Sequence, residues 1–401
     1  MHKIGPILKI GPISPTRNLV TLFKPDSTVE NRVVVAMSGG VDSSVAAALL
    51  VEQGYDVVGM MMRLWSEPAI GADAPTNRCC TPDQMADARR VADQLRIPFY
   101  VVDVQEHFRR TIVQFFIDEH EHGRTPNPCL ECNRQIRFTF LLNQALALDA
   151  NYLATGHYAR IDPTSAGYRL HQGVDAAKDQ AYVLHMLTQE HLAHVKLPVG
   201  EYTKAEVRQL AVRFNLPVAA KSESQDLCFL GDGDYRRFLR QYSQRAGQPG
   251  PIMDEDGRLL GQHHGLPFYT VGQRKGLGLS APEPLFVLRK DGAHNALIVG
   301  PHAALGQRSL TARQVNWIAG APPPPDRPVQ VKIRYRAAPV AGYVREEGGN
   351  GRIRVTFPEP VIGITAGQGV VLFQGDECLG GGIIDDETQP TQAHNNGKEP
   401  T

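Results

Sequence analysis

The sequence lacks an excess of charge of either sign, because lysine plus arginine and aspartate plus glutamate number 42 each. No global field therefore attracts nucleic acid, and any RNA contact has to come from local patches. Nothing in the chain approaches the roughly 20 consecutive apolar residues that a membrane-spanning helix needs. Six cysteines in 401 residues are too few for a secreted disulfide framework. These absences predict a cytoplasmic protein of two or three domains with no membrane partner.

The most informative stretch is Ala36-Met-Ser-Gly-Gly-Val-Asp-Ser-Ser44, which follows the apolar run 33–35 and opens a segment with helical periodicity. A strand, a Ser/Gly turn and a helix in succession gather backbone N–H groups around an anion at the helix N-terminus. Gly39 and Gly40 lack Cβ atoms, so a phosphate is able to approach the main chain. The stretch has no lysine and is not a Walker A loop. An ordinary glycine-rich turn is the alternative, but the pattern resembles the pyrophosphate loop of ATP pyrophosphatases, which cleave ATP between its α and β phosphates.

Residues 32–222 alternate apolar strand-like runs with helical patterns. We expect strands at 33–35, 57–62, 99–104 and 152–154, and helices around 45–50, 82–95 and 133–148. The second helix begins with a capping box, Thr81-Pro-Asp-Gln84. Such alternation predicts an α/β catalytic domain with a parallel sheet wrapped by helices and a ligand outside the carboxyl ends of the strands.

The composition of the sequence changes after residue 222. Residues 247–283 are rich in glycine and proline, and we expect a small central domain over residues 223–302. The duplicated Lys-Ile-Gly-Pro-Ile near the start argues against a helix. Residues 1–31 are therefore interpreted as a disordered extension or a misassigned start, with an organelle transit peptide as the less favoured alternative. Residues 387–401 are polar and are expected to form a disordered tail.

The last third alternates in the manner of an antiparallel sheet. Residues 329–336 place valines, Ile333 and Tyr335 on one face and basic side chains on the other. Further short strands are expected at 352–357, 370–373 and 382–384. The pattern predicts a small antiparallel β-barrel over residues 303–386. Its basic outer face is either simply solvated or binds RNA.

Two cysteines, Cys129 and Cys132, form a Cys-x-x-Cys that enters the expected helix at 133–148. A thiol at a helix N-terminus has a lowered pKa and is reactive near neutral pH. Taken alone, the motif indicates a redox dithiol, half of a metal site or a coincidence. A third thiol, Cys228, lies in a polar stretch that is able to cover a crevice.

The other cysteines are expected to be core or loop residues. Cys378 falls in an expected strand region, and Cys79-Cys80 has the wrong spacing to complete a zinc site with the Cys-x-x-Cys.

From about Arg32 to Ile384 the chain resembles the bacterial tRNA-specific 2-thiouridylases. The stretches that carry the resemblance are AMSGGVDSS (36–44), TPNPCLECN (125–133), TGHYAR (155–160), KDQAYVL (178–184), SQDLCFLG (224–231), GQRKGLGL (272–279), RYR (334–336) and LGGGII (379–384). The resemblance implies a pyrophosphatase-type α/β domain, a central domain and a C-terminal β-barrel. It also implies replacement of O2 of the wobble uridine, position 34 of tRNA, by sulfur.

The resemblance implies roles for particular residues. ATP contacts are implied at Ala36, Met37, Ser38, Gly39, Gly40, Val41, Asp42, Ser43, Met62 and Gly156. Contacts with the target base are implied at Asn127, Pro128 and Cys129. Contacts with tRNA are implied at His157, Lys178, Asp179, Gln180, Arg334, Tyr335 and Gln368. For His157 the alternative is a satisfied loop histidine.

The implied reaction uses ATP with Mg²⁺ on the pyrophosphate to adenylate O2 of a flipped-out uridine, so that AMP becomes the leaving group. Cys228 matches the residue that carries a persulfide, and Cys132 matches the thiol that attacks it. This attack releases sulfide onto C2 or leaves a Cys132–Cys228 disulfide. The implied partners are tRNA for lysine, glutamate or glutamine and a sulfur donor, such as a cysteine desulfurase or a relay protein.

One departure leaves the sulfur chemistry open. Some members of the family have an aspartate at the position of Cys129. Here Cys129, Cys132 and Cys228 make three thiols, the number that holds three irons of a [4Fe–4S] cluster and leaves the fourth iron open.

Two other classes of protein compete. A pyrophosphate-loop ligase acting on a small molecule, of the argininosuccinate- or GMP-synthetase kind, explains the loop but leaves the thiols without a role. A non-enzymatic RNA-binding module leaves the ATP loop unexplained.

Overall fold

The computed structural model describes residues 31–67, 81–222, 227–348 and 351–386. The expected N-terminal extension up to residue 30, the Cys79-Cys80 pair and the expected tail from residue 387 lie outside the described residues. Within them, no helix is long and apolar enough to cross a membrane.

The first domain is built on a five-stranded parallel sheet with the strand order β3-β2-β1-β4-β7. The strands are β1 (Arg32–Ala36), β2 (Asp56–Arg63), β3 (Phe99–Asp103), β4 (Tyr152–Ala154) and β7 (Val195–Lys196). Val33, Val34 and Val35 of the central strand are fully buried, as an apolar run between two covered faces requires. The chain runs outward from β1 to β3 and then returns to the other side of β1. The carboxyl end of β1 is therefore the topological switch point, where such sheets bind ligands.

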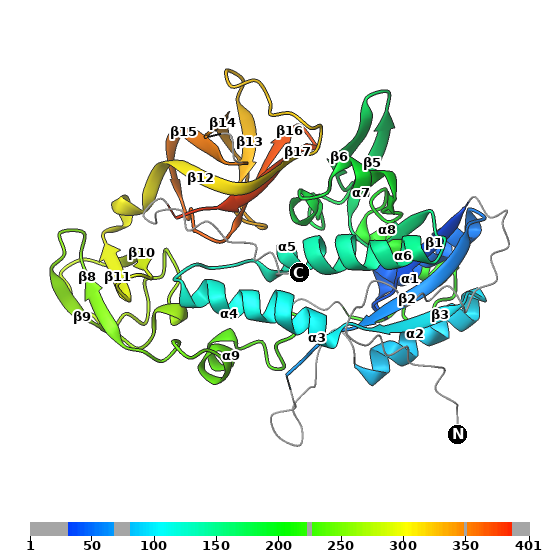
Figure 1. The fold of residues 1–401 in the computed structure, drawn as a ribbon, viewed down its shortest axis with the longest axis horizontal. Helices are drawn as coiled ribbons and strands as arrows, with labels where there is room; N and C mark the ends of the chain where they lie inside the picture. Colours follow the sequence, from blue (N-terminus) through cyan, green and yellow to red (C-terminus); the bar gives the residue numbers. More distant parts are fainter. Residues whose placement is uncertain (1–30, 68–80, 223–226, 349–350, 387–401) are drawn as a thin grey trace, which may run out of the picture.

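Helices flank the sheet (Figure 1). They include α1 (Val41–Glu52), α2 (Pro82–Leu95), α7 (Gln189–Ala193) and α8 (Lys204–Arg213), whereas α3 (Gln105–Phe108) and α4 (Gln114–Glu121) lead from β3 toward the second domain. The expected capping box of α2 is present, with Thr81 and Gln84 bonding each other's backbone. The helix expected at 133–148 begins earlier, at Pro128. It consists of three consecutive pieces without a break: α5 (Pro128–Cys132), a π-helical stretch (Asn133–Leu141) and α6 (Leu142–Ala147). Cys129 therefore lies in its first turn, and Cys132 begins its second turn.

The second domain is a small four-stranded sheet with the order β10-β11-β8-β9. Its strands are β8 (Gly250–Met253), β9 (Leu259–His263), β10 (Phe286–Asp291) and β11 (Ala296–Gly300), and α9 (Tyr235–Tyr242) precedes them. This sheet lies beyond the end of α4 that leads into α5 (Figure 1). The close approach is backbone on backbone: a Cβ on Gly292 would lie 2.4 Å from the carbonyl oxygen of His122.

The third domain is an antiparallel barrel with the order β12-β15-β14-β13-β16-β17, closed by pairing of β12 with β17. The strands are β12 (Gly306–Trp317), β13 (Val329–Lys332), β14 (Val340–Glu346), β15 (Ile353–Ile362), β16 (Gly369–Gln374) and β17 (Glu377–Ile384). The predicted α/β class with a central domain and a C-terminal barrel is confirmed. The strand expected over 329–336 is too long, since β13 ends at Lys332 and Arg334 and Tyr335 lie in the following turn.

A hairpin of the first domain extends the sheet of the third. Strands β5 (Ala159–Thr164) and β6 (Gly167–Gln172) form the hairpin, and β6 pairs antiparallel with β17. Ion pairs support this junction, with 2.5 Å between Arg160 Nη2 and Asp376 Oδ2. The sequence pattern did not predict this connection.

Candidate active site

The loop after β1 has the geometry expected of an anion site. Ser43 Oγ accepts a hydrogen bond of 3.1 Å from the backbone N–H of Ser38 and lies 3.2 Å from Ser38 Oγ. Gly40 occupies the N-cap of α1 without a side-chain cap, so backbone N–H groups of the first turn are available to a ligand. The loop lies at the switch point of the sheet, where a nucleotide phosphate is expected.

Two glycines are required by close approach. Gly39 has φ +71°, and a Cβ there would lie 2.3 Å from the carbonyl oxygen of Gln84. A Cβ on Gly156, which follows β4, would lie 2.7 Å from the backbone nitrogen of Ser43. The segments after β1 and β4 therefore touch, and they bring two predicted ATP-contact regions together. Met62 lies at the carboxyl end of β2, beside β1 on the other side.

Two lysines that the sequence pattern did not single out lie at this loop. Lys204 Nζ donates to Asp42 Oδ1 at 2.6 Å, and Tyr158 Oη donates to the same oxygen at 2.7 Å. Lys221 Nζ donates to the carbonyl oxygen of Gly39 at 2.9 Å and to Asp87 Oδ2 at 2.6 Å. The cationic charge that the loop sequence lacks is thus supplied by distant segments.

The thiol-bearing helix begins at a defined cap. Asn127 Oδ1 accepts a hydrogen bond of 3.1 Å from the backbone N–H of Cys129, and Pro128 occupies the first helical position. Cys129 is exposed, Cys132 is buried and Cys228 is half-buried. Cys132 belongs to a large apolar core to which all three domains contribute, and Cys228 packs against that same core.

The barrel approaches this helix around Leu130. A Cβ on Gly369 would lie 2.9 Å from Leu130 Cδ1 and 3.0 Å from Tyr182 Oη, which donates to the carbonyl oxygen of Gly369 at 2.9 Å. The rings of Tyr182 and Tyr335 lie 5.9 Å apart. Burial raises the pKa of Tyr335, and the nearby charges of Asp179 and Cys129 add to this rise. Residues predicted to contact the target base and tRNA therefore meet at one place.

Several predicted tRNA contacts have internal partners. Asp179 is 5% exposed and accepts hydrogen bonds from Gln172 and from the backbone of Gly173 and Ala181. Gln180 Oε1 accepts from the backbone N–H of Tyr158 at 3.0 Å. Lys178, next to them, is half-buried. These bonds shape the loop that follows β6.

His157 is buried and hydrogen-bonded. Its Nδ1 lies 2.7 Å from Thr155 Oγ1, and its side chain packs 5.9 Å from the ring of Phe138. Burial lowers the pKa of His157 to about 3, with a smaller contribution from Arg137. The histidine is therefore neutral at pH 7, and this environment is that of the alternative, a satisfied loop histidine. A tRNA contact by His157 stays a prediction.

The remaining two predicted contacts lie on the barrel rim. Gln368 Nε2 donates to the carbonyl oxygen of Thr125 at 2.8 Å. Arg334 Nη2 donates to Thr365 Oγ1 at 2.7 Å, whereas its buried Nε has no hydrogen-bond partner among the described residues. Burial lowers the pKa of Arg334. The ordinary pKa of arginine lies far above neutral pH, however. The guanidinium thus keeps its charge, and its Nε is an unused donor among the described residues.

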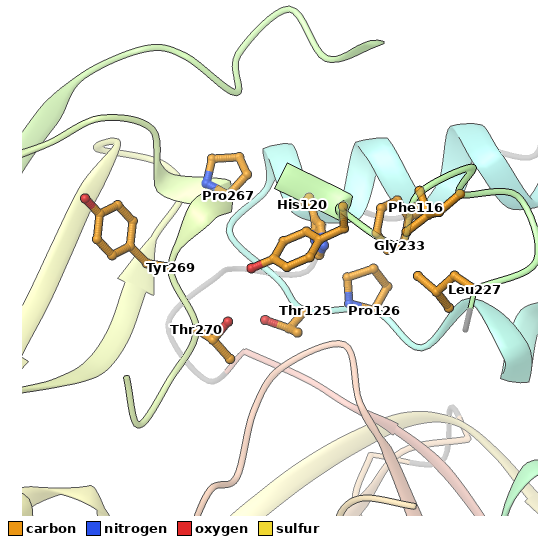
Figure 2. A pocket seen from close by; sticks show the side chains of 11 residues that line it. Phe116, His120, Thr125, Pro126, Leu227, Gly233, Pro267, Tyr269 and Thr270 are labelled. Carbon is orange, nitrogen blue, oxygen red and sulfur yellow. The ribbon is translucent and has the colours of Figure 1, made fainter. Parts of the chain in front are cut away.

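A cavity of about 240 Å³ lies beside the thiol-bearing segments. It is bounded by Pro126, which precedes the cap of α5, by Leu227, which precedes Cys228, and by Tyr269 of the central domain. Figure 2 shows the side chains of Thr125 and Thr270 facing each other across it. Segments of the first and central domains thus border one cavity, which α4 also lines.

Three family models match consecutive parts of the chain. They are the tRNA methyl transferase HUP domain over residues 31–232, the tRNA methyl transferase PRC-barrel domain over 236–301 and the aminomethyltransferase beta-barrel domain over 307–384. The curated tRNA-specific 2-thiouridylase MnmA of Moorella thermoacetica is 49% identical over 358 residues, which cover 89% of this chain and 100% of the relative. The chain belongs to the tRNA-specific 2-thiouridylase family.

Further relatives extend over the same span. The protein of the same name from Magnetococcus marinus is 49% identical over 89% of this chain and 99% of its own length. The one from Heliobacterium modesticaldum is 46% identical over 89% of this chain and 93% of its own length. The match therefore includes all three domains of this family member.

Proposed function

We propose that this protein is a sulfurtransferase that makes 2-thiouridine at the wobble position, uridine 34, of tRNA. The observation that carries the proposal is the 49% identity to a 2-thiouridylase over that relative's whole length. The geometry supports it because a nucleotide loop and a thiol-bearing helix belong to the same domain and the barrel contacts that helix. A small-molecule ligase would have no use for this arrangement.

In this proposal O2 of the uracil attacks the α-phosphorus of ATP, pyrophosphate leaves, and the adenylated oxygen becomes a good leaving group. Backbone N–H groups of residues 38–43 bind its phosphates, and Lys221 and Lys204 balance charge around the loop. Mg²⁺ would be held mainly by the phosphates, with Asp42 as the carboxylate that the loop offers, and would neutralise charge on the leaving pyrophosphate. Gly156 and Met62 flank the adenine end of the nucleotide.

Cys228 receives the sulfur as a persulfide from a cysteine desulfurase or a relay protein. The Cys132 thiolate attacks the Cys228 sulfur of the persulfide, which releases hydrosulfide and forms a Cys132–Cys228 disulfide. Hydrosulfide adds to C2 of the adenylated uridine, and AMP leaves with the former O2. Reduction of the disulfide by a thiol reductant restores the enzyme.

The tRNA is bound by polar and cationic groups around α5. Asn127, Pro128 and Cys129 contact the flipped base, while Lys178, Arg334 and Tyr335 are placed around the approach to it. Because the net charge of the chain is zero, affinity depends on this local group. The favoured substrates are tRNAs for lysine, glutamate and glutamine.

A [4Fe–4S] cluster on Cys129, Cys132 and Cys228 is the alternative route to the same product. Within the residues that the structure describes, no three His, Cys, Asp or Glu side chains gather around one metal position. The three thiols as they lie do not fit the cluster.

The test is an anaerobic reaction of the purified protein with unmodified glutamate tRNA, ATP, Mg²⁺, a cysteine desulfurase and cysteine, followed by mass spectrometry of the digested tRNA. We expect 2-thiouridine that disappears without ATP and in Cys132→Ala and Cys228→Ala. Product that survives in Cys129→Ala supports the persulfide. A brown preparation that loses its colour and activity in Cys129→Ala supports the cluster. Intact ATP–pyrophosphate exchange without 2-thiouridine would contradict the proposal and favour a ligase.

A further inference from the structure

A lysine of the central domain is buried against the turn that leads into the thiol-bearing helix. Lys290 of β10 is 6% exposed. Its Nζ donates to the carbonyl oxygen of Arg124 at 3.1 Å and to Thr125 Oγ1 at 3.3 Å. Among the described residues no carboxylate forms an ion pair with it. Burial accordingly lowers the pKa of Lys290 to about 7.

Such a residue is costly to the fold. An amine that is buried without a carboxylate loses hydration that two neutral acceptors only partly replace. A methionine of similar length would fill the same space without this penalty, and replacing buried charge by apolar atoms is often neutral or stabilising. Packing alone therefore does not explain a lysine here.

The turn that Lys290 contacts is held from the barrel as well. The backbone N–H of Thr125 donates to the carbonyl oxygen of Ala366 at 2.9 Å, and Gln368 Nε2 donates to the carbonyl oxygen of Thr125 at 2.8 Å. Every polar group of Thr125 is thus bonded to a residue of another domain. Two residues later, Asn127 caps the helix that carries Cys129 and Cys132.

The residues before this turn leave little freedom to absorb a shift. Arg124 Nε donates to Glu119 Oε2 of α4 at 2.7 Å, and the backbones of His122 and Gly292 are in direct contact. A displacement of the central domain relative to α4 would therefore move residues 124–127, and with them the cap of α5.

We propose that Lys290 is a positioning residue for the reaction: its side-chain nitrogen, through its two hydrogen bonds, fixes the Arg124–Thr125 turn so that Asn127, Cys129 and Cys132 are held in the geometry for the bound uridine. The inference rests on the proposed function for its effect on rate. The fixing of the turn by Lys290 does not depend on which reaction the thiols perform.

The test compares Lys290→Met with Arg289→Met, which removes the exposed neighbouring cation on the other face of β10. For Lys290→Met we expect at least a tenfold lower kcat for 2-thiouridine formation, with KM for tRNA within twofold of the wild type. We also expect Tm to be equal or higher, because the buried charge is gone. Arg289→Met should retain the wild-type kcat. An unchanged kcat in Lys290→Met overturns the proposal, as does a loss of activity that only follows a lower Tm.

A second readout does not depend on thiolation. Amide hydrogen exchange followed by mass spectrometry should become at least tenfold faster in residues 124–132 of Lys290→Met and stay unchanged in α1 and α8. Thr125→Val, which removes only the Oγ1 acceptor, should show a smaller change in the same segment. Unchanged exchange in both variants would show that Lys290 does not fix the Arg124–Thr125 turn. If the wild-type protein makes no 2-thiouridine, the proposed function fails while the exchange result still decides the role of Lys290.

Discussion

Lys221 and Gly39 are far apart in the sequence, but Lys221 Nζ donates a hydrogen bond of 2.9 Å to the carbonyl oxygen of Gly39. The same ammonium group lies 2.6 Å from Asp87 Oδ2. Burial opposes ionisation of Asp87, yet the hydrogen bonds from Lys221 and Arg90 hold its pKa below the ordinary value. A positive charge is therefore fixed at the edge of the loop that is proposed to bind phosphate.

Replacement of Lys221 by methionine should weaken nucleotide use. We expect KM for ATP to rise about tenfold, equivalent to roughly 1.4 kcal/mol, because the cation beside the loop is lost and Asp87 is left with fewer donors. Steady-state kinetics with varied ATP would measure it. Lys275→Met, at an exposed site of the central domain, is the matched control. An equal KM in Lys221→Met and the wild type would contradict the role.

Replacement of Gly39 by alanine should damage the loop beyond the cost of its backbone angle. At φ +71° an alanine is strained by about 1–2 kcal/mol, and its Cβ would also collide with the Gln84 carbonyl group. Gly54→Ala is the matched control, since Gly54 has φ +82° and nothing within 4 Å of the added Cβ. Both variants should lose stability in thermal unfolding, but only Gly39→Ala should lose activity more than tenfold. Equal activities would show that the close contact is unimportant.

Stability should fall in acid because of buried neutral histidines. Burial lowers the pKa of His157 to about 3 and that of His185 to about 4. The unfolded chain binds these protons near pH 6.5, so the full stability is present above that pH and is lost as pH falls toward the folded values. At pH 5 each of these histidines lowers the free energy of unfolding by about 2 kcal/mol.

Thermal unfolding at pH 7.5 and 5.0 would test this for His157. We expect a smaller drop in Tm for His157→Gln than for the wild type, because the glutamine does not titrate. His302→Gln, at an exposed site, should show the wild-type drop. A drop as large in His157→Gln would mean that other groups carry the acid sensitivity.

Loss of Arg334 should weaken tRNA binding in a way that depends on salt. If its guanidinium contacts one phosphate, Arg334→Met should reduce the slope of log affinity against log salt by roughly 0.7–0.9. Filter binding at several salt concentrations would measure this slope. Arg327→Met, in an exposed loop of the barrel, should leave it unchanged. An unaltered slope for Arg334→Met would mean that Arg334 contacts no phosphate and acts only through its hydrogen bond to Thr365.

Local signals predicted the elements that form the loop after β1 and the thiol-bearing helix. The capping box at Thr81, the Ser/Gly turn after β1 and the alternation in β15 each depend on neighbours within a few residues, which a sequence displays directly. The α/β class with a terminal barrel followed from these patterns and was confirmed.

Long-range contacts decided what the sequence did not disclose. Alternation continues to Tyr335, but β13 stops at Lys332 because Arg334 bonds Thr365 and the ring of Tyr335 packs beside Tyr182. Lys221 and Lys290 stand in ordinary local surroundings, and only the fold brings them to the loop and the turn. The helix at 133–148 starts earlier than expected because Asn127 and Pro128 form a good N-terminus, a signal that was present in the sequence.

The pairing of β6 with β17 has a consequence for how the protein is made. The partners His171 and Glu377 are about 200 residues apart, and a ribosome that adds about 5–20 residues per second needs roughly 10–40 s to cover that distance. Until then the hairpin of the nascent first domain presents an open strand edge, which is a template for wrong pairing. During synthesis the catalytic domain therefore has an unpaired strand edge for this interval. A chaperone or rapid docking of the barrel would protect that edge from aggregation.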